Sequence, residues 1–293
     1  MDLETFVAEC WRDHADDPRG VADRLGDGLA LVTDEAQIAD LIGLANHVFG
    51  SHLAAWHEGL AFFDRVAALP SLADDGTSGQ TLRRCKASLA LAAGIEDMRP
   101  ALPAAERIRV GVMAAASVAE HDAERATALF GAALEEARSA GLAPSDPANR
   151  ALAANGNNLA STLEQKAERS TAERELMILA AHTARHYWAI AGTWLETERA
   201  EYRLAMTWMQ AGDLAQARQH AQACLEIVEA NDNPALEAFF GWEALGQVER
   251  ASGNRTGHAH ALAMARPAFE RLPDDDKAWC RDVLTALEAD RVD

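Results

Sequence analysis

From Glu196 to Glu270 the chain reads ETERAEYRLAMTWMQAGDLAQARQHAQACLEIVEANDNPALEAFFGWEALGQVERASGNRTGHAHALAMARPAFE, and this stretch decides the fold. Apolar residues recur every three or four positions on both sides of Gly212 and again on both sides of Gly253. Such spacing places the apolar residues on one face of a helix, and glycine is common just after the last helical residue. The stretch therefore predicts two successive helix-turn-helix units.

Both units place small residues where two helices would cross, with large residues beside them. The small residues are Ala205, Ala217, Gly246 and Ala265, and the large ones are Leu204, Trp208 and Trp242. The pattern resembles the tetratricopeptide repeat, a helical hairpin of about 34 residues. It departs from that family at His258, where alanine is usual, and in the wider spacing of the two turn glycines. The resemblance implies an all-α fold, a right-handed superhelical solenoid of antiparallel helix hairpins.

The remainder of the chain continues the helical pattern, and we expect about fourteen helices. Polar caps and prolines predict helix starts, for example at Asp2 and at Asp17-Pro18. The segment Pro70–Gly79 is rich in Gly, Ser and Asp, which is typical of a linker. We therefore predict weak N-terminal helical repeats over residues 1–69 and tetratricopeptide-like repeats over residues 80–293, the last helix capping the array. One continuous solenoid is the alternative.

Composition limits the classes of partner. The chain carries 46 acidic and 27 basic residues, a formal net charge of −19, and such a surface repels nucleic acid and anionic membranes. We expect neither as a partner. No apolar run approaches the roughly 18 residues that span a membrane, and the acidic N-terminus lacks the basic region of a signal peptide. The four cysteines are far apart in the sequence, which favours a reducing, cytoplasmic location.

Catalytic motifs are missing from the sequence. There is no GxSxG and no GxxxxGK. His182 and His186 lie four residues apart, a spacing that can hold a metal, but the intervening sequence lacks the glutamate of zinc proteases. His47, His52 and His57 are five residues apart and would face different sides of a helix. We therefore predict no catalytic residue, no metal site and no cofactor.

The strongest candidate site lies on the first helices of the predicted repeats, which line the concave surface in the family. Asn158 precedes Leu159-Ala160, Arg203 precedes Leu204-Ala205, and Arg199 lies one turn before Arg203. This resembles part of the clamp with which some members of the family hold a peptide carboxylate, and arginine grips carboxylates with two donors. The groove residues expected to contact a partner are Asn157, Asn158, Arg199, Tyr202, Arg203, Met206, Gln247 and Arg250.

A plainer interpretation is that Arg199 and Arg203 pair with Glu198, Glu201 or Glu164 and only solubilise the groove. On balance the resemblance favours a non-enzymatic scaffold or adaptor that binds a protein or peptide segment, through a carboxylate in that segment. One alternative is a sensory domain that binds a short signalling peptide or small ligand and regulates a partner. A second alternative is a histidine- or metal-dependent enzyme. The sequence leaves the oligomeric state open.

Overall fold

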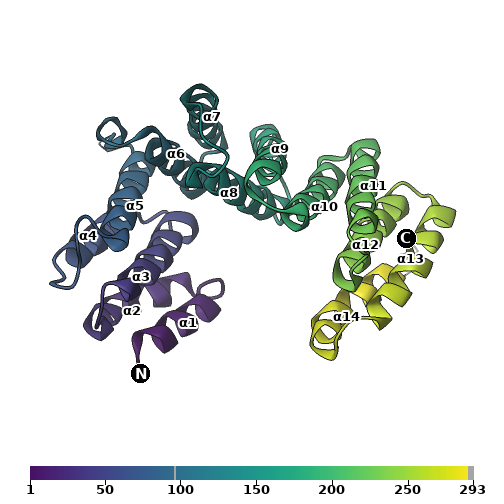
Figure 1. The fold of residues 1–293 in the computed structure, drawn as a ribbon, viewed down its shortest axis with the longest axis horizontal. Helices are drawn as coiled ribbons and strands as arrows, with labels where there is room; N and C mark the ends of the chain where they lie inside the picture. The colour runs from purple at the N-terminus through teal and green to yellow at the C-terminus, as the bar shows by residue number, and fades with distance from the viewer. Residues whose placement is uncertain (96, 290–293) are drawn as a thin grey trace. The chain divides into compact units, whose positions relative to one another are not determined.

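The protein is all-helical. The computed structural model describes residues 1–95 and 97–289, and in that part of the chain it contains fourteen α-helices and no strand. Helices make up 80% of the structure, so the predicted all-α class is confirmed. The chain forms two compact units, Met1–Ala151 and Leu152–Asp293, whose residues contact one another mainly within each unit. Figure 1 labels the helices of both units, and each unit is described by itself.

Within its described residues, the first unit contains seven α-helices, a π-helix, a short 3-10 helix and the beginning of α8. They are α1 (Leu3–Asp13), α2 (Pro18–Leu31), α3 (Ala36–Asn46), η1 (His47–His52), α4 (Trp56–Ala67), α5 (Thr77–Ala93), η2 (Arg99–Ala101), α6 (Ala104–Val118), α7 (Ala123–Ala140) and α8 (Pro147–Glu164). The described part of the second unit contains the end of α8 and six further helices. They are α9 (Thr171–Ala191), α10 (Trp194–Ala211), α11 (Leu214–Ala230), α12 (Ala235–Ala251), α13 (Arg255–Glu270) and α14 (Asp274–Glu288). Within the described residues, no helix combines the length and the apolar character that crossing a membrane requires.

Local sequence signals explain where these helices begin and end. The carboxylate of Asp2 accepts a hydrogen bond from the backbone N–H of Thr5 at 2.9 Å and caps α1. Asp17 caps α2 in the same way, through the N–H of Gly20. Gly212 and Gly253 adopt φ values of 86° and 71° at the two predicted turns. Only glycine takes this left-handed conformation at little cost, so the predicted turn positions are confirmed.

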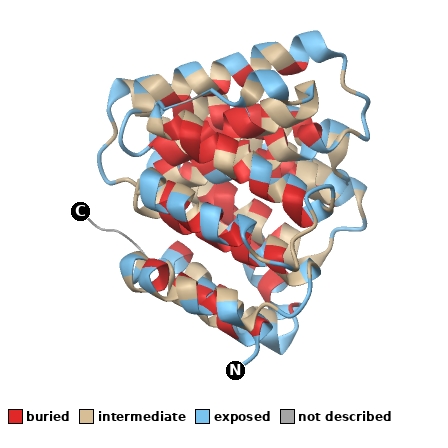
Figure 2. Ribbon diagram, turned by 90° about the vertical axis from the view of Figure 1, so that its left-hand side faces the viewer, coloured by how far each residue is buried: buried red, intermediate tan, exposed pale blue. Residues whose placement is uncertain are grey.

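The core of the first unit is formed by side chains of the successive helices from α1 to α5. Phe63, Leu25 and Ile38 are among its fully buried side chains, and Figure 2 shows such buried residues alternating with exposed ones along the helices. The predicted linker, residues 70–79, lies within this unit, and its last three residues already belong to α5. There the Ser78 hydroxyl donates to the Glu35 carbonyl at 2.7 Å. Helix α5 also contacts α3 and α4, so the segment connects packed helices.

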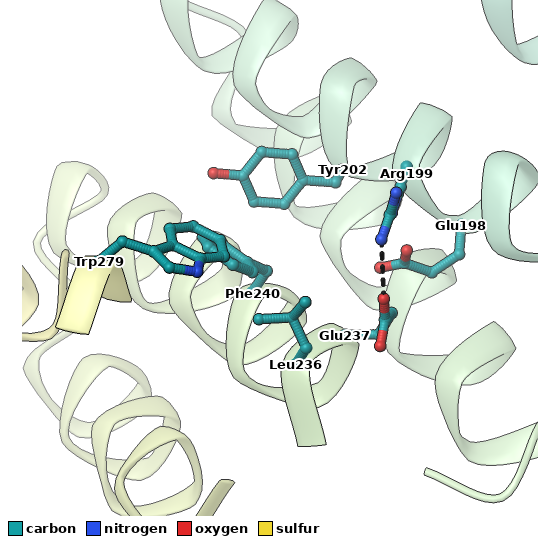
Figure 3. A pocket seen from close by; sticks show the side chains of 7 residues that line it. All are labelled: Glu198, Arg199, Tyr202, Leu236, Glu237, Phe240 and Trp279. Carbon is teal, nitrogen blue, oxygen red and sulfur yellow. Dashed lines mark hydrogen bonds and ion pairs between the residues drawn. The ribbon is translucent and has the colours of Figure 1, made fainter. Parts of the chain in front are cut away.

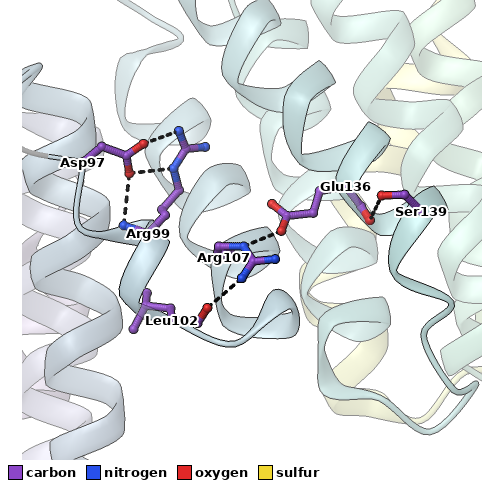
Figure 4. Close-up of polar contacts among 6 residues, drawn as sticks. All are labelled: Asp97, Arg99, Leu102, Arg107, Glu136 and Ser139. Atoms are coloured by element: carbon purple, nitrogen blue, oxygen red, sulfur yellow. Dashed lines mark hydrogen bonds and ion pairs between the residues drawn. The ribbon is translucent and has the colours of Figure 1, made fainter.

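A close crossing joins α6 to α7. A Cβ added at Gly111 would lie 3.0 Å from the Cβ of Ala133, so only a small residue fits at this point. One end of the crossing is held by Arg107, whose Nε lies 2.5 Å from Glu136 and whose Nη1 donates to the Leu102 carbonyl at 2.8 Å (Figure 4). The hairpin therefore combines small-residue packing with a half-buried ion pair.

The second unit is built from consecutive hairpins. Helix α10 packs on α11, α12 packs on α13, and α10 also contacts α12. The predicted crossing residues Ala205, Ala217 and Ala265 are fully buried, and Gly246 is buried as well. Pro273 precedes α14, which packs on α12 and α13. The prediction that the hairpins wind into a right-handed superhelix stays a prediction.

Candidate functional site

A pocket of about 340 Å³ opens between three helices of the second unit. Its lining comes from α10 (Glu198, Arg199 and Tyr202), from α12 (Leu236, Glu237 and Phe240) and from α14 (Trp279) (Figure 3). The lining combines three aromatic rings with two carboxylates and one guanidinium. Ligand sites usually consist of an apolar wall with a few placed polar groups, so this pocket is the strongest candidate for a functional site.

Glu198 is the unusual group in the pocket. Its side chain is 2% exposed, and its Oε1 accepts a hydrogen bond from the Cys224 thiol of α11 at 2.8 Å. Its Oε2 is buried, and no described residue forms a hydrogen bond with it. Burial raises the pKa of Glu198 to about 7, and nearby Glu237 adds to the shift. A buried carboxylate oxygen with no partner is costly, and a ligand that supplied a donor or a positive charge would remove that cost.

The thiol is the donor in this pair. Burial and the adjacent Glu198 carboxylate raise the pKa of Cys224 far above its ordinary value, so the thiol keeps its proton. Cys224 thereby occupies one oxygen of Glu198, a residue of the pocket lining, and does not bond to the other.

The remaining charges partly cancel. The Nη2 of Arg199 lies 3.1 Å from Glu237, and Figure 3 shows this pair beside the Glu198 carboxylate. The Arg199 side chain is well exposed, whereas that of Glu237 is mostly buried. With Arg199 neutralising Glu237, ionised Glu198 leaves the pocket with a net negative charge.

The aromatic wall of the pocket consists of Tyr202, Phe240 and Trp279. The rings of Phe240 and Trp279 stack with centroids 5.4 Å apart at 21°, and Tyr202 meets Phe240 edge-on with centroids 5.9 Å apart. Trp279 is 54% exposed, although its indole N–H reaches Asp276 at 3.3 Å. Aromatic faces attract cations, so the wall and the carboxylates favour the same sign of ligand charge.

The structure pairs Arg203 with an internal carboxylate. Arg203 donates through Nη1 to Glu164 at the end of α8, and the Thr207 hydroxyl donates to the other oxygen of Glu164. Burial raises the pKa of Glu164, and Arg203 opposes that shift. This is one of the pairings that the plainer interpretation of the sequence named. Arg199 instead pairs with Glu237, a partner that the sequence did not indicate.

Other predicted groove residues surround a second buried carboxylate. The Tyr202 hydroxyl donates to Glu243 at 3.1 Å, and the Gln247 amide donates to the same carboxylate. Glu243 is 3% exposed, and burial raises its pKa. Arg250 donates to the Ala286 carbonyl at 2.8 Å and so joins α12 to α14.

The remaining predicted residues lie apart from the pocket lining. Met206 is buried in a cluster with Ala221, Leu225 and Ala244. Asn158 is exposed, and its Oδ1 accepts a hydrogen bond from Asn157 at 3.4 Å. Of the eight predicted groove residues, therefore, only Arg199 and Tyr202 line the pocket.

The two histidines with metal-binding spacing in the sequence, His182 and His186, have different neighbours. The ring of His182 packs edge-on against Trp208 and His220, whereas the ring of His186 packs against Tyr187. Glu201, near His220, is already held by Arg185 at 2.5 Å and by His220 at 2.7 Å. The arrangement is that of a packed polar interface between helices.

Sequence reasoning missed the residues of α12 and α14 that complete the pocket. A signal existed in the consecutive pair Phe239-Phe240. Neighbouring residues on a helix point about 100° apart, so the two rings of this pair leave the helix in different directions. Phe239 is fully buried, whereas Phe240 is only half-buried and lines the pocket. Trp279 carried no comparable signal, because an amphipathic terminal helix accounts for a tryptophan equally well.

Comparison with family models, with curated proteins and with solved structures finds no match to this chain.

Proposed function

We propose that this chain is a non-enzymatic binding protein that recognises a protein segment through a basic side chain, held in the pocket between α10, α12 and α14. The observation that carries the proposal is the unpartnered, buried Oε2 of Glu198 beside a wall of aromatic rings. An ammonium or guanidinium group placed there would donate to that oxygen and lie against Phe240 and Trp279. Both interactions favour a cation over a neutral group of the same shape.

The volume of the pocket accommodates a single side chain or a small molecule. Sites for whole small molecules measure roughly 300–1,000 Å³, and the cavity of about 340 Å³ is at the lower end of that range. The net charge of −19 would also draw a basic segment toward the protein. This proposal keeps the peptide-binding role inferred from the sequence and changes the recognised group from a carboxylate to a cation.

We also propose that the hairpins belong to a tetratricopeptide-like array. Three features support this: left-handed glycines at the turns, small buried residues at the crossings, and contact between the first helices of successive hairpins, α10 and α12. In such arrays the first helices present the binding surface, and here they contribute six of the seven lining residues of the pocket. This placement supports a scaffold or adaptor role.

Calorimetric titration with short peptides tests the proposal. One peptide carries a central lysine, a second has norleucine in its place, and a third ends in a free acidic tail without a basic residue. We expect the lysine peptide to bind at least about tenfold more tightly than the norleucine peptide, the ratio that a desolvated cation–π contact provides. Equal affinity for the lysine and norleucine peptides would contradict the proposal. Tighter binding of the peptide with the acidic tail would favour the sequence-based prediction that the protein binds a carboxylate. If n-butylamine binds as tightly as the peptide, the sensory alternative with a small ligand takes its place.

Variants locate the binding in this pocket. Glu198→Gln and Trp279→Ala should each weaken binding of the lysine peptide. The matched controls are Glu229→Gln and Trp194→Ala, because Glu229 is exposed, Trp194 is a partly exposed tryptophan of the same unit, and neither lines the pocket. Equal losses in the variants and their controls would place the binding surface elsewhere.

A further inference from the structure

Three histidines of the first unit converge, although they come from separate parts of the chain. His14 caps the C-terminal end of α1, and His47 and His52 are the first and last residues of η1. One ring nitrogen from each lies within 4.8 Å of the other two, and the Nε2 atoms of His47 and His52 are 3.1 Å apart. All three residues are partly buried.

The π-helix is the reason that two of these rings meet. An α-helix turns by about 100° per residue, so positions five apart would point roughly 140° away from each other. In η1 the bonding runs over five residues, as in the hydrogen bond from the Leu53 N–H to the Val48 carbonyl at 3.1 Å. This wider turn stacks residue 52 over residue 47. The sequence-based view that His47 and His52 face different sides was therefore wrong, while His57 lies exposed on α4, outside the cluster.

The surrounding structure holds this rare geometry in place. Helix η1 contacts α2, α4 and α6. A Cβ at Gly50 would lie 2.7 Å from the Ser117 hydroxyl and 3.2 Å from a Leu89 methyl, so η1 approaches its neighbours closely. Just beyond η1, Ala54 adopts φ 47°, a left-handed conformation that costs energy for alanine. π-helical segments and strained residues occur frequently at functional sites.

The hydrogen bonding of His14 orients its ring for ligation. Its Nδ1 lies 2.5 Å from the Trp11 carbonyl oxygen. A carbonyl only accepts, so Nδ1 carries the proton, and in the neutral ring the lone pair is then on Nε2. A bond from the second ring nitrogen to a backbone carbonyl is the usual outer-shell arrangement of a metal-binding histidine. The residue before His14, Asp13, is held by Arg24 of α2 at 3.0 Å, which fixes this end of α1.

The distances suit a tetrahedral ion. With Zn–N bonds of about 2.0–2.1 Å, two ligands on tetrahedral zinc are roughly 3.3 Å apart. The separation of 3.1 Å between His47 and His52 is already close to this value. Since the group spans up to 4.8 Å, closure around an ion needs movements of about 1.5 Å, which ring rotation can supply. The Trp11 ring covers the cluster, its centroid 5.1 Å from that of His14 and 5.3 Å from that of His47.

We propose that His14, His47 and His52 form a binding site for a divalent transition metal, Zn²⁺, that ties the end of α1 to the π-helix η1. Three imidazoles with no carboxylate or thiol in the group favour zinc and its neighbours over magnesium or calcium. Three protein ligands leave the fourth tetrahedral position for water or an external group. The site lies in the first unit and is separate from the pocket of the second unit.

Metal titration of the full chain tests the site. The protein is freed of metal with a chelator, dialysed, and titrated with Zn²⁺ by calorimetry and with Co²⁺ by visible absorption. We expect one ion per chain, a d–d spectrum of tetrahedral intensity, and a higher melting temperature with bound Zn²⁺, because an ion that binds only the folded state stabilises it. Absence of stoichiometric binding would overturn the proposal.

Histidine variants separate the site from general binding by surface histidines. His47→Gln and His52→Gln keep a polar side chain of similar size, and each should weaken Zn²⁺ binding by more than the roughly 10- to 100-fold that loss of an outer-shell partner costs. One control is His57→Gln, because His57 is five residues after His52 and lies outside the cluster. The other is His186→Gln, because His182 and His186 have metal-binding spacing in the sequence. Far-ultraviolet circular dichroism establishes that each variant is folded. Unchanged affinity in a folded His52→Gln, or equal losses in the controls, would contradict the site.

Discussion

The thiol of Cys224 donates a hydrogen bond to Glu198 across the α10–α11 hairpin, with Sγ and Oε1 2.8 Å apart. The pair is buried, and among the described residues the second oxygen of Glu198 has no hydrogen-bond partner. A carboxylate in this position is poised between its two protonation states near neutral pH, which gives it measurable consequences for stability and for binding.

Stability should depend on pH through Glu198. Its pKa is about 7 in the folded chain against 4.5 as the ordinary value. The folded state therefore binds the proton more tightly, and stability is lost as the pH rises from about 4.5 through 7. Relative to Glu198→Gln, the parent should lose on the order of 2–4 kcal/mol across this range. Urea unfolding at pH 5 and pH 8 measures the difference, and a parallel pH profile for both proteins would contradict the assignment.

Cation binding should show the opposite dependence on pH. A lysine or arginine side chain stays charged throughout, but the pocket becomes negative only when Glu198 loses its proton, around pH 7. Affinity for the lysine peptide should therefore rise between pH 6 and pH 8, by up to about tenfold per unit below the pKa. Calorimetry in a series of buffers measures this change. Glu198→Gln should give a flat profile, and a falling affinity in the parent would exclude Glu198 as the binding group.

Arg203→Ala should destabilise the second unit. It removes the charged partner of Glu164, which is almost fully buried, and leaves that carboxylate with only the Thr207 hydroxyl. Breaking such a pair costs about 3–5 kcal/mol when fully buried, and since Arg203 is partly exposed we expect roughly 2–3 kcal/mol. Arg199→Ala is the matched control, because its guanidinium is 59% exposed in its pair with Glu237 and should contribute about 1 kcal/mol or less. If urea unfolding gave the same loss of stability for both variants, burial of the ion pair would not determine how much it contributes to stability.

Two glycine variants test the close helix crossings. In Gly156→Ala the new methyl would lie 2.7 Å from the Ala180 carbonyl oxygen and 3.0 Å from the Ala184 nitrogen, which are backbone atoms that cannot rotate away. We expect a loss of about 1–3 kcal/mol. Gly131→Ala is the control, because the methyl meets nothing within 4 Å in the middle of α7 and should stabilise that helix by about 0.5–1 kcal/mol. Thermal unfolding shows whether each variant is more or less stable than the parent. A Gly156→Ala variant more stable than the parent would contradict the close approach of α8 to α9 at this residue.

Much of the fold could be predicted because its signals are local. Caps such as Asp2 and turns such as Gly212 involve hydrogen bonds and dihedral angles within a few residues. The buried alanines of α11, for example Ala217 and Ala221, follow directly from helical spacing. Less of the candidate site could be predicted. Arg199 and Tyr202 were found because they lie on a first helix, whereas Trp279 joins them only through the packing of α14 against α12.

The sequence by itself determined the helices, their ends and their apolar faces, since each depends on residues within one or two turns of chain. Tertiary structure alone decided which charges meet. The chain has 46 acidic residues, and Arg203 pairs with Glu164 rather than with Glu201. That pairing depends on distances between separate helices. It also decided the path of η1, because close packing of Gly50 near Ser117 accompanies the wide turn that brings His47 beside His52. Such contacts join residues far apart in the chain, where helical periodicity carries no information about distance.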